Sequence, residues 1–290
     1  MFLFLSFTAY SQITSTQNGN WSDTNTWAGG SVPGASDAVV IAHDVSCASA
    51  QGAASLTVNN GKTLTLTKDG ALTVGTTVTN NGTIVVTGAE NESGSIIATD
   101  ADSFNLTYNL YIPASEWKLV GIPVSGLTVN DIDDNLATNG SKVGIGFYNS
   151  ETAAWSVFLS SQTTASISQT RGYEMMHASG DVVAFTGALR TSNRSTIATY
   201  ANKWALLGNP YPSYLRLSDD ATGASGTNYF LNSTHLSYLK GTHQAIYGWD
   251  GSAYDNATPA GDIGLSVSGN IITFSTKYFY IKSIRSNFIS

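Results

Sequence analysis

Few residues of this chain could act as an acid, a base or a metal ligand. The histidines form no H-E-x-x-H pattern or other metal-binding spacing, and there is no G-x-S-x-G elbow, P-loop or dinucleotide fingerprint. A glycosidase needs two carboxyl groups at a set separation, and no pair is marked by its context. We therefore expect a protein that is not an enzyme, without catalytic residues. The residues considered are His43, His177, His235, His243, Glu90, Glu92, Glu116, Glu151 and Glu174.

Aromatic residues beside turns are the best candidates for binding. They lie in "NPYPSY" and "AIYGWDGSAYDN", where Gly, Pro and Asn indicate turns. Rings on loops above a rigid scaffold can stack on sugar faces, while nearby polar groups bond hydroxyls. The same rings could instead form the core of a β-sandwich, and both interpretations stay open. The glycan-contact candidates are Tyr211, Tyr214, Tyr247, Trp249, Asp250, Tyr254 and Asn256.

Calcium is the one metal for which the sequence offers ligands. The segments "NDIDDN" and "DADS" cluster carboxylates, which repel one another unless they are solvated or share a cation. Neither segment is an EF-hand loop, so a solvated loop is the alternative. The calcium candidates are Asp131, Asp133 and Asp134, and no other cofactor is expected.

The charge content excludes several partners. Charged residues make up 11% of the 290 residues, against roughly 25% in ordinary soluble domains. The net charge is −7, and no Lys or Arg precedes Lys62. Nucleic acids and anionic membranes need clustered basic residues, so neither is an expected partner. The single cysteine, Cys47, excludes an intramolecular disulfide, and we expect its thiol to be buried as a small hydrophobe.

The elements that carry these residues are predicted to be strands. Between residues 55 and 86, Leu56, Leu64 and Leu72 recur every eight residues, and each is followed two residues later by another apolar residue. Asn60-Gly61, Asp69-Gly70 and Asn81-Gly82 separate these segments with residues that tolerate a positive φ. We favour a coil of stacked parallel strands, a β-solenoid, with Thr ladders outside. A meander of hairpins is the alternative, since Asn-Gly is a strong hairpin signal.

The N-terminal segment carries two further predictions. "MFLFLSFTAYS" reads as the apolar part of a signal peptide over residues 1–11, with its start truncated. Trp21 and Trp27 are placed to close the open end of a solenoid over residues 12–100. No apolar run reaches 18 residues, so no membrane span is expected.

An internal repeat follows residue 100. "WKLVGIP" at 117–123 returns as "WALLGNP" at 204–210, and "SGDVVAFT" at 179–186 returns as "SGNIITFS" at 268–275. "FYNSETAAW" and "IYGWDGSAY" lie between the two matches. We therefore expect residues 101–290 to form an antiparallel β-sandwich of two related halves, about 117–190 and 204–282, in an all-β chain.

These segments together resemble a known class of proteins. "NGNWSDTNTW…VPGASD", the Thr/Asn/Gly repeats and "KWALLGNPYPS" are similar to segments of large surface proteins of gliding and polysaccharide-feeding Bacteroidota, which are exported by the type IX secretion route. The resemblance implies a secreted or outer-surface location in a Gram-negative bacterium and adhesin-like roles. It also implies a C-terminal sorting domain, and we do not expect the closing segment "YFYIKSIRSNFIS" to be one, so that either the sequence is a fragment or the anchoring differs.

The functional expectation follows from these features. We expect an exported structural or adhesive surface module that displays β-sandwich loops to an extracellular polysaccharide or a surface protein. The alternative is a carbohydrate-binding module of a polysaccharide-utilisation system. A fragment of a β-helix polysaccharide lyase comes third, because about 85 residues make only some four coils.

Overall fold

The computed structural model describes residues 11–89, 92–98, 103–132, 135–189 and 203–213, together with the backbone of the later strands. The described elements are strands and three short 3-10 turns, η1 (Thr24–Thr26), η2 (Ala28–Gly30) and η3 (Val129–Asp131). The all-β prediction is therefore confirmed. The segment "LTVNDIDDNLATNG" contains the single turn η3 among its described residues.

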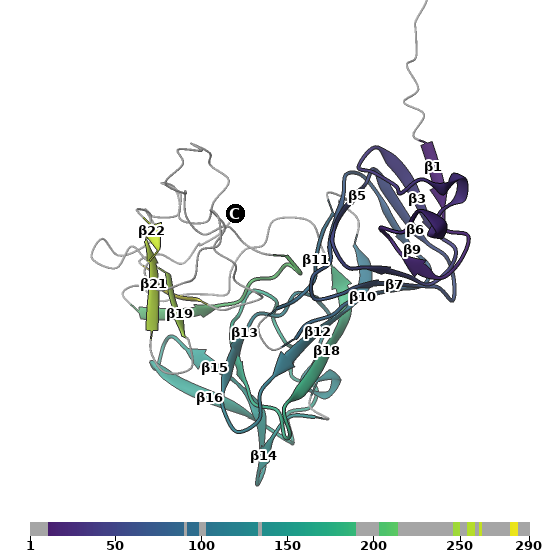
Figure 1. Cartoon of the computed structure of the whole chain (residues 1–290). Coiled ribbons are helices and arrows are strands. Elements are labelled where there is room, and N and C mark those ends of the chain that lie inside the picture. The colour runs from purple at the N-terminus through teal and green to yellow at the C-terminus, as the bar shows by residue number, and fades with distance from the viewer. Residues whose placement is uncertain are drawn as a thin grey trace, which may run out of the picture.

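The N-terminal part consists of three parallel arrays of strands that the chain visits in turn (Figure 1). Strands β3, β4 and β5 form one round, β6, β7 and β8 the next, and β9, β10 and β11 the third; each strand pairs in parallel with its equivalent in the neighbouring round. The hairpin alternative is therefore wrong for these strands. The first array is β1 (Ser11–Thr14), β3 (Asp37–Ile41), β6 (Ser55–Val58) and β9 (Val78–Asn80). The second includes β2 (Gly19–Asn20), β4 (Val45–Cys47), β7 (Thr63–Leu66) and β10 (Thr83–Val86). The third is β5 (Ala50–Ala53), β8 (Ala71–Val74) and β11 (Ser95–Ala98).

Alternation along these strands fills a shared interior. Leu56, Leu64 and Leu72 are buried, while Thr57 and Thr65 between the apolar positions are partly exposed. Cys47 is buried too, as expected, and its thiol donates to the carbonyl of Ser49. Burial raises the pKa of this thiol, so the sulfur stays a neutral packing group.

The glycines at the corners serve two different purposes. Gly61 adopts a positive φ of 70°. Gly70 and Gly82 do not have a positive φ. At these two positions a Cβ would collide with the backbone carbonyls of Cys47 and Lys62 respectively, so the neighbouring round leaves no room for a side chain.

Trp21 and Trp27, the two residues predicted to close the N-terminal end, lie in the core and contact each other. Both indoles are buried, and their ring centroids lie 5.1 Å apart in an edge-to-face contact. The Trp27 Nε1–H donates to the carbonyl of Trp21 at 2.7 Å. Among the described strands, β1 and β2 pair with the first round on this side, and both indoles belong to the same buried core as the first-round residues Val39 and Val45.

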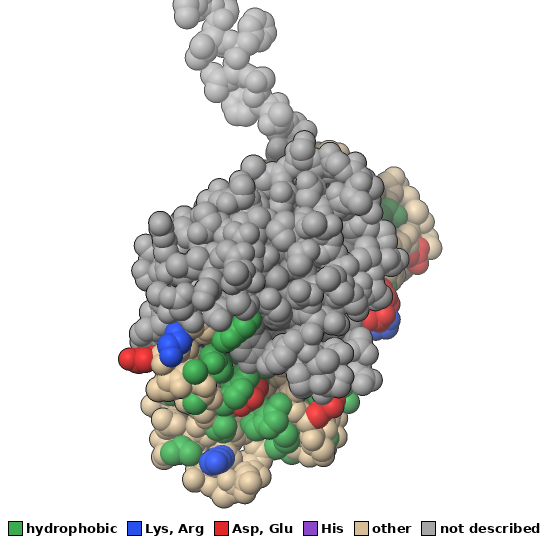
Figure 2. Space-filling view, turned by 90° about the vertical axis from the view of Figure 1, so that its left-hand side faces the viewer, with side chains coloured by type: hydrophobic (Ala, Val, Ile, Leu, Met, Phe, Trp, Pro, Cys, Tyr) green, Lys and Arg blue, Asp and Glu red, His purple; other side chains and the backbone are tan. Residues whose placement is uncertain are grey.

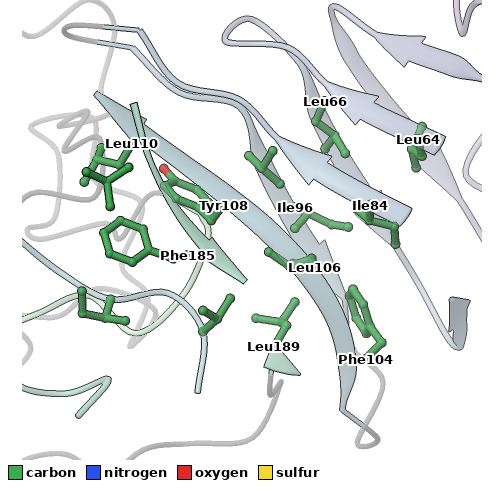
Figure 3. Packing of buried hydrophobic residues seen from close by; sticks show 14 of the residues in the cluster. Leu64, Leu66, Ile84, Ile96, Phe104, Leu106, Tyr108, Leu110, Phe185 and Leu189 are labelled. Carbon is green, nitrogen blue, oxygen red and sulfur yellow. The ribbon is translucent and has the colours of Figure 1, made fainter. Parts of the chain in front are cut away.

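The second array continues into the C-terminal part of the described chain. Strand β12 (Phe104–Ile112) pairs in parallel with β10 and in antiparallel with β18 (Asp181–Leu189), which gives one six-stranded sheet in the order β18-β12-β10-β7-β4-β2. Figure 3 shows Leu64 and Ile84 in the same core as Tyr108 and Phe185. The predicted boundary near residue 100 stays a prediction, but the sheet and the core are continuous across it.

Two antiparallel sheets follow, and they share one strand order. The first contains β13 (Lys118–Val120), β14 (Thr138–Asn139), β15 (Lys142–Asn149), β16 (Ala154–Leu159) and β17 (Tyr173–Met175). The second contains β19 (Lys203–Leu207), β20 (Ile246–Trp249), β21 (Tyr254–Thr258), β22 (Gly261–Asp262) and β23 (Phe279–Ser283). The order β13-β17-β15-β16 in the first corresponds to β19-β23-β20-β21 in the second, with every pair antiparallel.

The strand order pairs one segment of the first sheet with a different segment of the second sheet than the sequence match does. Leu119 lies opposite Glu174, and Leu206 lies opposite Tyr280, so β23 takes the place of β17. "RGYEMM" therefore matches "KYFYIKS" in position. Strand β18, which carries most of "SGDVVAFT", belongs to the six-stranded sheet, and its proposed match at 268–275 lies outside the described residues.

Candidate functional site

The predicted glycan-contact residues fall partly outside the described chain. Tyr214 and Asp250 lie outside it, and for the four candidates in β20 and β21 the structure describes the backbone. The register places Tyr247 opposite Asn256 and Trp249 opposite Tyr254. Residues opposite one another, and residues two apart on a strand, share a face. These four positions are therefore brought to one face of a hairpin.

Tyr211 lies in a turn that serves a structural purpose. The buried Asn209 accepts a hydrogen bond from the Tyr211 N–H at 3.1 Å and donates from Nδ2 to the Ser213 carbonyl at 2.7 Å. One residue before that, the Pro212 carbonyl accepts from the Ile96 N–H at 2.9 Å. The "GNPYPS" segment after β19 is thus hydrogen-bonded to the edge strand β11. The partly exposed Tyr211 lies in this segment.

Asp131 is occupied in capping a turn. Its carboxylate accepts hydrogen bonds from the Thr128 N–H and Oγ1–H, both at 2.7 Å, and these two bonds lower its pKa. Asp133 and Asp134 lie outside the described residues. Within the described part of the chain, no group of three or more His, Cys, Asp or Glu is placed to hold a metal ion. The calcium site stays a prediction.

The structure brings together an aromatic face that the sequence does not single out. Four large hydrophobic side chains of the described residues are well exposed, and three of them, Trp117 (38%), Trp155 (39%) and Leu159 (37%), belong to β13, β16 and their flanks. Trp155 and Leu159 alternate with the buried Phe158, so they point away from the core. Figure 2 shows hydrophobic side chains gathered on this side of the molecule, with an acidic side chain among them.

Tyr148 and Trp155 form a cross-strand pair on this outer face. They lie opposite one another in the β15–β16 hairpin, with ring centroids 5.6 Å apart and the planes at 75°. In the second sheet, Trp249 lies opposite Tyr254 in the β20–β21 hairpin. The match of "FYNSETAAW" with "IYGWDGSAY" aligns Tyr148 with Tyr247, but Tyr247 lies opposite Asn256, so the strand register does not reproduce this match.

Glu174 lies in the middle of the same face. It is partly buried between Leu119 on β13 and Gly146 on β15, and its Oε1 stands 2.8 Å from where a Cβ at Gly146 would lie. Burial raises the pKa of this carboxyl from 4.5 to about 7. No described residue donates a hydrogen bond to it. The face therefore combines aromatic rings with a carboxyl group that keeps its proton to a higher pH than an ordinary glutamate does.

The sequence contains a signal for this position, but a weak one. Tyr173 and Met175 point into the core, so alternation places Glu174 on the opposite face. The sequence gives no sign that Gly146 lies beside it, because the two residues are brought together only by the pairing of β15 with β17. Trp155, the last residue of "FYNSETAAW", is exposed, and nothing in the sequence around it indicates which face of the strand it occupies.

Comparison with known proteins gives a family and no activity. No curated protein and no solved structure matches the chain. Across the described residues, none of the elements is a helix with the length and apolar character needed to cross a membrane. The family described as a domain of unknown function (DUF8693) matches residues 12–260, which is most of the sequence, and the chain therefore belongs to this family.

Proposed function

We propose that this chain is an exported, non-catalytic surface module that holds a contact face on a stiff β-structure. One observation carries the proposal: the sheet β18-β12-β10-β7-β4-β2 runs without a break from the N-terminal cap to the antiparallel part. Each strand of this sheet is hydrogen-bonded to the next, so β2 near the N-terminus and β18 are mechanically coupled. A structure of this kind suits rigid display at a cell surface.

We further propose that the three parallel arrays are a short β-solenoid and that the two antiparallel sheets belong to a duplicated β-sandwich. Three rounds with parallel pairing support the first assignment. The shared strand order supports the second. In this arrangement the solenoid is the stalk, and the exposed part of the antiparallel sheet around Trp155 and Leu159 on β16 is the displayed surface.

The location follows the resemblance to Bacteroidota surface proteins. We propose export by the type IX route and residence outside the cell. The low charge content and the Thr-rich outer positions of the solenoid support an extracellular structural role, since solubility rests there on hydroxyl groups instead of charges.

The test combines location with activity in a Bacteroidota host. Intact cells that express the tagged full chain are treated with proteinase K, and a periplasmic marker serves as the control. We expect the chain to be accessible to the protease in intact cells while the marker is protected. Purified protein is also incubated with neutral and anionic polysaccharides, and we expect neither new reducing ends nor unsaturated products. Protection from the protease, or cleavage of any polysaccharide, contradicts the proposal.

A further inference from the structure

We propose that the outer face around Tyr148, Trp155 and Glu174 binds the pyranose rings of a neutral polysaccharide. The inference rests on the proposed function, because it names the ligand of the displayed face. The proposed contact lies on the β15–β16 hairpin and the neighbouring β17, whereas the sequence places the glycan-contact candidates in later turns.

The aromatic pair provides a stacking surface with a fixed orientation. Tyr148 meets Trp155 edge to face, at an interplanar angle of 75°, and Trp155 stays 39% exposed. The tyrosine thus supports the indole from the side and leaves ring surface open to the solvent. The apolar C–H face of a pyranose is complementary to such a ring, and the pair is held by two adjacent strands of one hairpin.

The carboxyl group of Glu174 provides the polar half of the site. Gly146 and Tyr148 are two residues apart on β15, so Glu174, which faces Gly146, lies about 7 Å along the strand direction from the aromatic pair. Gly146 has no side chain, and the Glu174 Oε1 lies 2.8 Å from where a Cβ on this glycine would stand. A partly buried carboxyl that receives no hydrogen bond from a described residue is satisfied by an occupant that brings hydroxyl donors.

The chemistry of the face separates neutral sugars from other occupants. An anionic polysaccharide would bring carboxylates or sulfates toward Glu174 on a chain of net charge −7. A protein partner that covered the aromatic residues with apolar side chains would bury Glu174 without a donor, at a cost in binding free energy. Hydroxyl groups beside an apolar ring face, as in glucans and mannans, meet both requirements at once.

Affinity electrophoresis of the full chain tests the inference. The gels contain laminarin, galactomannan or hydroxyethylcellulose as neutral ligands, alginate as an anionic ligand, and chitosan as a cationic one. We expect retardation in at least one neutral gel and none in alginate. We expect Trp155→Ala to weaken that interaction at least 10-fold, Trp155→Phe to weaken it by less than about 3-fold, and Glu174→Gln to weaken it about 3- to 10-fold. Ile97→Ala, which removes the exposed hydrophobic residue on β11, is the matched control and leaves retardation unchanged.

Three results overturn the inference. They are the absence of retardation in every neutral gel, retardation that is unaffected by Trp155→Ala, and retardation by chitosan alone, which would assign a cationic ligand. Thermal melts of the variants show that the fold is kept. Surface exposure in the protease assay is independent of these results, so loss of glycan binding with an exposed chain rejects this inference and leaves the proposed function standing.

Discussion

Gly121 and Gly208, which hold the same place in the two copies of W-x-L-x-G-x-P, lie backbone against backbone. A Cβ on Gly208 would stand 2.9 Å from the Gly121 Cα and 2.7 Å from the carbonyl oxygen of Arg171. A Cβ on Gly121 would stand 2.6 Å from the backbone nitrogen of Asn209. The two occurrences of this sequence segment therefore lie against each other, and their glycines are required for that close approach.

Gly208→Ala is expected to destabilise the protein. The added methyl group meets backbone atoms on both sides, which cannot move without shifting β19, so we expect a loss of about 1 to 3 kcal/mol in the free energy of unfolding. Urea denaturation measures this loss. Gly75→Ala is the matched control, because its nearest neighbour is the Ala54 carbonyl oxygen at an ordinary 3.7 Å. Equal effects of the two substitutions would contradict the close approach.

Removal of the N-terminal cap is expected to open the first round of strands. Trp27→Ala deletes a buried indole and its hydrogen bond to the Trp21 carbonyl, so we expect a loss of about 3 to 5 kcal/mol. Trp27→Phe keeps an aromatic ring, and we expect a smaller loss. Hydrogen exchange should show β1 and β3 becoming unprotected before β10. Trp155→Ala, at an exposed tryptophan, is the control and should change stability little; a comparable loss there would argue against the cap.

The sequence predicts those properties of the strands that depend only on residues close together in the chain. The eight-residue recurrence of Leu56, Leu64 and Leu72 predicts alternation and burial, since side-chain direction follows from the strand itself. Whether such strands pair in parallel or as hairpins depends on contacts about 20 residues apart, and the Asn-Gly corners are compatible with both. The sequence therefore favours the parallel coil without excluding the meander.

The candidate site was harder to predict for the same reason. Glu174, Gly146 and Leu119 are far apart along the chain, and only the pairing of β17 with β13 and β15 sets them in one row. Aromatic content alone does not separate exposed rings from core rings: Tyr173 and Tyr108 are buried, whereas Trp155 is exposed. A ring is buried or exposed according to whether it lies on the face of its strand that packs against the core.

The contact between the two copies is expected to show energetic coupling. Leu119 and Leu206 are buried against each other, with Tyr148 and Trp204 packed beside them. We expect each Leu→Ala change to cost about 2 to 4 kcal/mol, and the double variant to lose less than the sum by about 0.5 to 2 kcal/mol. Unfolding free energies of the four proteins give the coupling. Leu119→Ala with Leu64→Ala, a residue of the N-terminal stack, is the comparison pair and should be additive; coupling of equal size in both pairs would contradict a local contact.

Glu174 is expected to make stability depend on pH in a direction opposite to that of an ordinary carboxylate. Its pKa rises from 4.5 to about 7 on folding, so between these values the folded state binds more protons than the unfolded state. The free energy of unfolding should therefore fall as the pH rises from about 4.5 to about 7, and the contribution of this one group should then level off. After allowance for solvent screening of a partly exposed group, we expect a change of about 1 to 2 kcal/mol.

Glu174→Gln removes this titration while it keeps the shape of the side chain. We expect the variant to be more stable than the parent protein at pH 8 and nearly equal to it at pH 4.5, as measured by thermal melts across that range. Ile97→Ala, at an exposed residue without a titratable group, is the control and should leave the pH profile of the parent unchanged. A Glu174→Gln profile parallel to that of the parent would show that the carboxyl is solvated in the folded protein. The row Leu119, Glu174, Gly146 would then hold a hydrated charge, and the polar half of the sugar site would lose its physical basis.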